Sequence, residues 1–180
     1  QTVCSMVMAS RDVIGSIEWV KSIADEGDKI PALVEKGKSN FAGPELMGKT
    51  VGIVGVGAIG TRTAELCHAF GCKILGNKRH VRGNEPDYIE FVSLEELLSR
   101  SDIVSLHCPL NENSRGMINK DTIAKMKPGA LLINAARGPV VDSQALADAL
   151  NSGYLGGAGI DVFETEPPLD PAHPLLHSKN

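Results

Sequence analysis

The sequence is poor in cysteine and aromatic residues and contains no long apolar run. Its 180 residues include four cysteines, and no two of them form a C-x-x-C pair. This excludes a disulfide framework and argues against a structural zinc site, so we expect reduced thiols and no metal. No apolar stretch approaches the roughly 20 residues that span a bilayer, and no basic segment followed by an apolar core marks a secretory leader. The sequence therefore favours a cytoplasmic protein with no membrane partner.

Neither sign of charge is in large excess. The chain has 18 Lys and Arg against 22 Asp and Glu, a net charge of −4, which argues against a general nucleic-acid-binding domain. Hydrophobic residues make up 42% and charged residues 22%, proportions that separate the chain from disordered and collagen-like sequences. A chain of this length buries a real core but is short for two complete domains. We expect one main globular domain.

The pattern of apolar residues divides the chain into three parts. Residues 1–40 read as one amphipathic helix followed by a polar linker with at most a short helical piece. Residues 41–165 alternate short apolar strands with amphipathic stretches of helical length, which predicts an α/β fold with a doubly wound parallel sheet, the Rossmann fold. Strands are expected at 50–54, 73–76, 89–92, 103–107, 131–134 and 158–162. Residues 166–180 are rich in proline and should be extended.

The central part has residues typical of helix starts and helix ends between its predicted strands. Ser93, Asn119 and Asp142 stand where helix N-caps are expected, and Gly129 and Gly153 stand where helices are expected to end. In the helix that follows the first strand, the positions near helical spacing predict one face that covers the sheet. That face comprises Ile59, Thr63, Leu66, Cys67 and Phe70.

A glycine-rich segment lies between the first strand and this helix. Gly55, Gly57 and Gly60 form G-x-G-x-x-G in the strand-turn-helix setting that a dinucleotide site requires. Gly55 would allow the tight turn, Gly57 would let a diphosphate approach the backbone, and Gly60 would let helix and strand pack closely. Ala58 and Ile59 start the helix whose N-terminus attracts phosphate, so we include them in the site. The alternative is a tight turn without a ligand.

The end of the second strand is basic where an acidic residue usually binds the adenosine ribose. No acidic residue occurs between positions 66 and 84, and Lys78 and Arg79 follow the strand directly. Two cations in this place suit the 2′-phosphate of NADP, which favours NADP over NAD without excluding NAD. The alternative is a solvated basic turn.

Three later segments carry a specific resemblance. Residues 101–110 (SDIVSLHCPL), 126–138 (MKPGALLINAARG) and 159–167 (GIDVFETEP) resemble the D-isomer-specific 2-hydroxyacid dehydrogenases. The likeness spans roughly residues 40–177, and within the family it is greatest to the 3-phosphoglycerate dehydrogenases of serine biosynthesis. It implies hydride transfer between NAD or NADP and a small 2-hydroxy or 2-oxo acid. Glyoxylate and hydroxypyruvate reductases, and corepressors that sense the cofactor, are alternatives within the same resemblance.

The candidate site residues follow the strands at their carboxyl ends, where open parallel sheets bind ligands. His107, Cys108 and Pro109 would line the cofactor pocket, although His107 could also be a plain strand-end residue. Small side chains at Ala135 and Ala136 would admit the nicotinamide ring.

Arg137 is the strongest catalytic candidate, because its planar guanidinium can hold a carboxylate and polarise the neighbouring carbonyl. The resemblance implies that Asp161 contacts the nicotinamide side and that Glu166 raises the basicity of a catalytic histidine. That histidine would lie in a T-P-H segment that this sequence does not contain, and His173 and His177 read as surface residues. We therefore expect a substrate domain from chain outside residues 1–180 and an inactive isolated chain. The apolar N-terminal helix, without that domain, would offer a surface for a homodimer.

Overall fold

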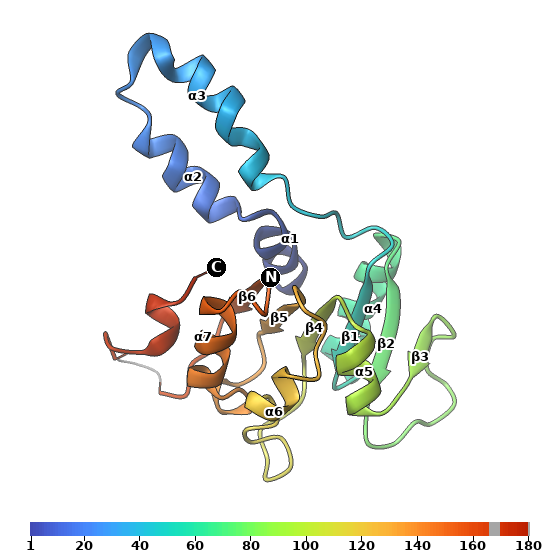
Figure 1. Cartoon of the computed structure of the whole chain (residues 1–180). Helices are drawn as coiled ribbons and strands as arrows, with labels where there is room; N and C mark the ends of the chain where they lie inside the picture. Colours follow the sequence, from blue (N-terminus) through green and yellow to red (C-terminus); the bar gives the residue numbers. More distant parts are fainter. Residues whose placement is uncertain (166–169, 180) are drawn as a thin grey trace.

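The computed structural model describes residues 1–165 and 170–179, and its centre is a six-stranded parallel sheet (Figure 1). The strand order is β3-β2-β1-β4-β5-β6, which is the order of the doubly wound Rossmann fold and confirms the predicted fold class. The strands are β1 (Thr50–Val54), β2 (Lys73–Asn77), β3 (Ile89–Phe91), β4 (Ile103–Leu106), β5 (Leu131–Asn134) and β6 (Gly157–Ile160). All six predicted strands are present, with shifts only at their ends.

The strand order reverses between β1 and β4, which are neighbours in the sheet although β2 and β3 separate them in sequence. Val54 at the end of β1 pairs with Asn77 at the end of β2 on one side and with Leu106 at the end of β4 on the other. The connections leaving β1 and β4 therefore diverge from one point. Ligands of open parallel sheets bind in the crevice that this divergence creates.

Helices cover both faces of the sheet and bury two apolar clusters. On one face, α1 (Thr2–Arg11) and α4 (Ala58–Ala69) contribute Met6, Ala64 and Cys67. On the other face lie α5 (Leu94–Arg100), α6 (Lys120–Ile123) and α7 (Ser143–Asn151), whose apolar side chains pack with Leu106 and Leu132. Successive residues of the strands point to opposite faces, so both clusters draw on the same strands.

The predicted N-caps form in the structure. The Ser93 hydroxyl accepts a hydrogen bond from the backbone N–H of Glu96 (3.2 Å), and the Asp142 carboxylate accepts one from Ala145 (3.0 Å). Asn119 makes a full capping box, because its side chain accepts from Thr122 and its own N–H donates to the Thr122 hydroxyl (2.8 Å). The three helices that cover the second face thus begin where the sequence places them.

The N-terminal segment is two helices and not the single helix expected from its periodicity. Asp12 adopts a left-handed conformation (φ 42°, ψ 51°) that ends α1, and its carboxylate accepts from the N–H of Gly15 (3.1 Å) to cap α2 (Val13–Ser22). Met6 of α1 is fully buried against the sheet, whereas α2 and α3 (Ile30–Gly37) bury no residue. The last two project from the body as a hairpin with the short turns η1 (Gly27–Lys29) and η2 (Lys38–Phe41) (Figure 1). The division of the chain at residues 40 and 165 stays a prediction.

The buried face of α4 differs from the expected one. Gly60, Thr63, Ala64 and Cys67 face the sheet, while Ile59 is 72% exposed and both Leu66 and Phe70 are also exposed. Small residues face the sheet because the helix approaches it closely: a methyl group at Gly60 would overlap the carbonyl oxygen of Gly55. Among the helices that the structure describes, none is long and apolar enough to cross a bilayer.

Candidate active site

The glycine turn between β1 and α4 has the shape that the sequence predicts. Gly55 has φ 96°, and a side chain there would come within 2.7 Å of the backbone of His107 and Cys108. Only glycine satisfies both the left-handed backbone and this close approach. At Gly57, by contrast, a Cβ atom would meet nothing within 4 Å, so the surface beside the helix start is open.

The N-terminus of α4 is suited to an anion. Gly57 is the N-cap, and no side chain accepts a hydrogen bond from the first turn. The first-turn amides of Ala58 and Ile59 therefore lack a capping side chain, and both residues are exposed. A helix of 12 residues adds a positive partial charge at this end. These residues fit the diphosphate of a dinucleotide.

A cavity of about 650 Å³ begins at this turn and runs along the carboxyl ends of β1, β2 and β4. It brings together seven of the predicted cofactor residues, namely Gly55, Gly57, Lys78, Arg79, His107, Cys108 and Pro109. Residues from the loop after β4, among them Asn111 and Ser114, complete the wall. Sequence reasoning missed these two residues. The Ser114 hydroxyl donates to the carbonyl of Pro109 (2.7 Å), which holds the loop against the strand end.

His107 lines the cavity with a neutral ring. Its Nε2 lies 2.9 Å from the hydroxyl oxygen of Ser105, which is itself fully buried in β4. Burial lowers the pKa of His107 to about 4. Burial likewise raises the pKa of the neighbouring Cys108 thiol. Near neutral pH both side chains are therefore uncharged, so His107 forms a wall of the cavity and is not an acid poised for proton transfer.

Lys78 is not a free cation, because Glu85 pairs with it. The Lys78 ammonium lies 2.7 Å from the Glu85 carboxylate, whose side chain is only 9% exposed. The hydrogen bond from Lys78, together with backbone N–H groups of Arg82 and Gly83, lowers the pKa of Glu85 to about 2. Arg79 is exposed and has no ion-pair partner among residues 1–165 and 170–179. No local pattern in the sequence predicts the Lys78–Glu85 pair.

The turn after β5 carries Arg137 and is held by the buried side-chain amide of Asn134, a residue that sequence reasoning missed. Asn134 is 1% exposed, its side-chain nitrogen donates to the carbonyl of Arg137 (3.0 Å), and its side-chain oxygen accepts from the N–H of Ala136 (3.1 Å). Ala135 is half-buried, Ala136 is buried and Arg137 is exposed. The Arg137 guanidinium donates to the carbonyl of Ala136 (2.6 Å). Neither alanine nor Arg137 lines the cavity beside Gly57.

The chain that leaves β6 returns to this same turn. The N–H of Asp161 donates to the carbonyl of Asn134 (3.0 Å), and Asp161 itself is exposed. Gly138 packs against the backbone of Phe163 and Glu164 with no room for a side chain. The segment that carries Asp161 is thereby fixed beside Arg137. Glu166 lies outside the described residues, so its predicted role stays a prediction.

His173 is not the plain surface residue that its irregular setting suggests. Its Nε2 lies 3.0 Å from the Glu164 carboxylate, its side chain is 13% exposed, and its ring packs edge-on against Phe163. The Ser143 hydroxyl donates to the other oxygen of Glu164. Partial burial raises the pKa of Glu164, but the hydrogen bonds from Ser143 and His173 outweigh it and hold the pKa below its usual value. His177 is exposed, as expected.

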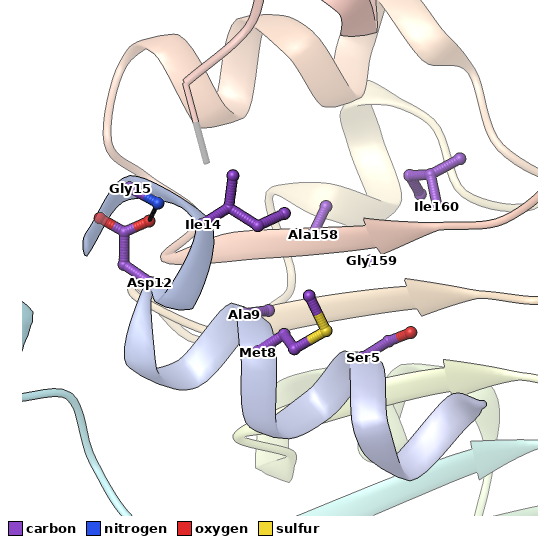
Figure 2. A pocket seen from close by; sticks show the side chains of 9 residues that line it. All are labelled: Ser5, Met8, Ala9, Asp12, Ile14, Gly15, Ala158, Gly159 and Ile160. Atoms are coloured by element: carbon purple, nitrogen blue, oxygen red, sulfur yellow. Dashed lines mark hydrogen bonds between the residues drawn. The ribbon is translucent and has the colours of Figure 1, made fainter. Parts of the chain in front are cut away.

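A second cavity of about 540 Å³ lies between the N-terminal helices and the edge strand β6. Figure 2 shows Met8 of α1 and Ile14 of α2 beside Ala158 of β6. No predicted site residue lines it. Within the part of the chain that the structure describes, no three His, Cys, Asp or Glu side chains gather in a way that would hold a metal ion.

Known proteins share this architecture and sequence. The chain is 49% identical over 143 residues to the glyoxylate reductase of Thermofilum pendens, covering 78% of this chain and 42% of that protein. It is 44% identical over 135 residues to the D-3-phosphoglycerate dehydrogenase of Mycobacterium bovis, covering 74% of this chain and 26% of that protein. The crystal structure of the D-lactate dehydrogenase from Aquifex aeolicus complexed with NAD and lactic acid matches with a TM-score of 0.79 at 36% identity, over 92% of this chain and 47% of that one. The chain thus spans less than half the length of these relatives.

A family model covers nearly the whole chain. The model of the D-isomer specific 2-hydroxyacid dehydrogenase NAD-binding domain matches residues 4–180. The match agrees with the Rossmann strand order and with the open glycine turn at the start of α4. The chain therefore belongs to the D-isomer-specific 2-hydroxyacid dehydrogenase family, as its NAD-binding domain.

Proposed function

We propose that this chain is the cofactor-binding part of an oxidoreductase that transfers hydride between a nicotinamide dinucleotide and a small D-2-hydroxy acid. The observation that carries the proposal is the uncapped N-terminus of α4 at the mouth of a 650 Å³ cavity. Phosphate binding at such a helix end needs only backbone N–H groups and an open approach, and Gly57 supplies the approach. When bound, the nicotinamide cofactor accepts or donates the hydride.

Arg137 would hold the substrate carboxylate and stabilise charge on the carbonyl oxygen at carbon 2. Asn134 supports this role because it fixes the backbone on either side of Ala136 with two hydrogen bonds. A guanidinium on a rigid turn loses little freedom when it grips a carboxylate, which makes the grip more effective. Ala135 and Asp161 would lie on the nicotinamide side of the same turn.

Proton transfer would need a histidine such as the one the family resemblance implies, in a T-P-H segment that residues 1–180 do not contain. His107 has a pKa of about 4 and lines the cofactor cavity, and the ring of His173 is engaged with Glu164. Glu166 would position and activate the histidine in the whole enzyme. We propose that the isolated chain binds cofactor but turns over substrate poorly, since acid–base catalysis is commonly worth about 10² to 10⁴-fold.

The substrate we favour is 3-phosphoglycerate, with glyoxylate and hydroxypyruvate as alternatives. The resemblance of residues 41–50 (FAGPELMGKT) and 8–12 (MASRD) to the 3-phosphoglycerate dehydrogenases supports the first choice, together with the 44% identity to one of them. The identity to a glyoxylate reductase (49%) and to a hydroxypyruvate reductase of Blautia hydrogenotrophica (45%) supports the others. The residues that contact the rest of the substrate would determine which of these acids the enzyme uses.

The cofactor is proposed to be NAD or NADP, with the preference for NADP resting on Arg79. Lys78 was expected to contribute equally, but it is paired with Glu85. Arg79 lines the cavity and is exposed, so it can still meet a 2′-phosphate. No nucleic acid or membrane is a proposed partner, and the cytoplasm is the proposed location.

A homodimer is the proposed assembly, formed through the projecting N-terminal hairpin. Ile14, Ile17 and Val20 of α2 are 63%, 49% and 53% exposed, and no residue of α2 is fully buried. Exposed apolar side chains on one element mark a contact surface. A cofactor-sensing corepressor would use the same hairpin for assembly and would show no turnover even at full length.

Binding and turnover measured separately test this proposal. The purified chain is titrated with NADH and NADPH while nicotinamide fluorescence is followed, and the full-length protein is assayed with 3-phosphoglycerate, glyoxylate and hydroxypyruvate. We expect dinucleotide binding by the chain and turnover of one of these acids by the full-length protein. Binding of neither cofactor would refute the proposed function. Cofactor binding without any turnover at full length would favour the corepressor.

A further inference from the structure

The loop between β2 and β3 contains an anion site that the chain fills with its own carboxylate. Glu85 accepts hydrogen bonds from the Lys78 ammonium (2.7 Å) and from the backbone N–H groups of Arg82 (2.9 Å) and Gly83 (2.8 Å). Successive N–H groups that converge with an ammonium form a concave site for an anion. Glu85 is therefore tightly held, and the groups that donate to it belong to the loop between β2 and β3 and not to the G-x-G-x-x-G motif.

The same loop borders the dinucleotide cavity. Lys78 and Arg79 line that cavity together with Gly55 and Gly57. The Lys78 ammonium also lies 5.9 Å from the centre of the Phe91 ring, so two contacts hold it in place. Any group that enters the cavity near Lys78 meets a cation whose charge the Glu85 carboxylate already balances.

We propose that Glu85 weakens the binding of NADPH relative to NADH by occupying Lys78, and so opposes the contribution of Arg79. This rests on the proposed function, because it assumes that the adenosine end of the dinucleotide lies near Lys78 and Arg79. A 2′-phosphate that approaches Lys78 must either share it with a second anion or expel Glu85 from its hydrogen bonds. Like charges in one site repel, and expulsion leaves the N–H groups of the loop without their acceptor. A 2′-hydroxyl is neutral and carries neither penalty.

The role of Glu85 differs from that of the acidic residue usually found at the end of the second strand. That residue binds the ribose hydroxyls directly, and it is absent here between positions 66 and 84. Glu85 acts on selectivity through Lys78, so it is a positioning residue. Its removal should strengthen NADPH binding and leave NADH binding nearly unchanged.

The test is the ratio of the two dissociation constants, measured by nicotinamide fluorescence on the folded chain. In Glu85→Gln, the amide oxygen can still accept from the loop N–H groups while the charge is gone. We expect NADPH to bind roughly tenfold tighter than to the unaltered chain, and NADH to change less than about twofold. Glu85→Ser is a second neutral variant in case the first alters the loop, and circular dichroism reports which variants are folded.

Two further variants assign the effect to the Lys78–Glu85 pair. In Lys78→Gln/Glu85→Gln the gain for NADPH should disappear, because the freed ammonium is no longer there. Glu90→Gln is the matched control: Glu90 pairs with Arg100 at 2.8 Å in the same way, but neither residue lines the cavity. It should leave the ratio unchanged.

The outcomes test the role of Glu85 separately from the proposed function. An unchanged ratio in both neutral variants, with both cofactors still bound, would overturn the role of Glu85 and leave the proposed function intact. A gain that persists in the double variant would show that Lys78 is not the group involved and would also overturn it. Binding of neither cofactor by the unaltered chain would refute the proposed function together with this inference.

Discussion

Gly138 is packed so closely against Phe163 that a methyl group on Gly138 would overlap the Phe163 carbonyl. This contact joins the turn after β5 to the segment after β6, which are separated by the whole of α7. It sets the position of Arg137 relative to Asp161, although neither side chain takes part. Two segments that carry candidate site residues are thereby aligned through backbone alone.

Replacing Gly138 with Ala should therefore destabilise the protein and move the Asp161 segment. Overpacking at a site that cannot yield typically lowers the free energy of unfolding by about 1–3 kcal/mol. Urea unfolding of the 180-residue chain measures this. A variant as stable as the original would show that the two segments can separate freely.

Gly57→Ala is expected to behave in the opposite way. Its Cβ would meet no atom within 4 Å, and its φ of −98° is accessible to alanine, so stability should be unchanged. The methyl group would instead obstruct the approach to the start of α4, and NADH affinity should fall by about tenfold or more. Fluorescence titration and thermal melting together check this. Loss of stability without loss of affinity would contradict the proposed cradle.

Arg137→Ala in the full-length enzyme should damage turnover far more than cofactor binding. Removal of a group that stabilises developing charge commonly lowers kcat by about 10² to 10³-fold. The dissociation constant of NADH should change little, because Arg137 does not line the cofactor cavity. Arg79→Ala is the matched control and should affect NADPH binding alone. Equal loss of turnover and NADH affinity in Arg137→Ala would defeat the assigned role.

His107 should make the protein less stable as the pH falls. Its pKa is about 4 in the folded chain against an ordinary value of 6.5, so the neutral ring stabilises the folded state above pH 6.5. That contribution is lost as the pH falls from 6.5 toward 4, because the unfolded chain binds the proton first. This lowered pKa corresponds to a loss of about 3 kcal/mol in the free energy of unfolding once the pH is well below 4.

Urea unfolding of the original chain and of His107→Gln, repeated between pH 7.5 and 4.5, isolates this effect. The variant lacks the titrating ring, so its stability should depend less on pH over that interval. Parallel pH profiles for the two proteins would show that His107 is not the group responsible. The Ser105 hydroxyl, which lies 2.9 Å from the ring, is present in both proteins.

Ile17→Glu should weaken self-association of the chain. The side chain is 49% exposed on α2, and a carboxylate there would be buried without a partner in a dimer. Analytical ultracentrifugation of both proteins over a range of concentrations measures the change. Leu176→Glu, equally exposed on the short η4 turn (Pro174–His177), is the control. Association that survives Ile17→Glu would place the dimer contact elsewhere.

Sequence reasoning succeeded where one local signal determines the structure. The strands are short apolar runs bounded by polar residues, and Ser93 and Asn119 cap helices through hydrogen bonds that span only three residues. It failed at Asp12, where a non-glycine residue takes a left-handed conformation that no periodicity reveals. It also failed for Ile59, because spacing alone does not show which side of a helix approaches the sheet.

The candidate site could be predicted as a set of positions but not as a set of contacts. The rule that ligands bind at the carboxyl ends of strands was enough to select Gly57 and His107 for the cavity. The pairing of Lys78 with Glu85 depends on how the intervening turn folds, and the fixing of Arg137 depends on Asn134, which reads as an ordinary strand residue. Such contacts follow from tertiary geometry and leave no pattern in the chain.

The candidate site residues lie at the end of the sheet where the strands β1 and β4 finish. The opposite end of the sheet carries glycine turns. Gly48, Gly71, Gly129 and Gly153 precede β1, β2, β5 and β6, and all four have φ between 75° and 80°. Fluorophores or surface tethers attached beside these turns would sit far from the cofactor entrance. An immobilised form of this protein, oriented by that end, would leave the cavity facing the solution.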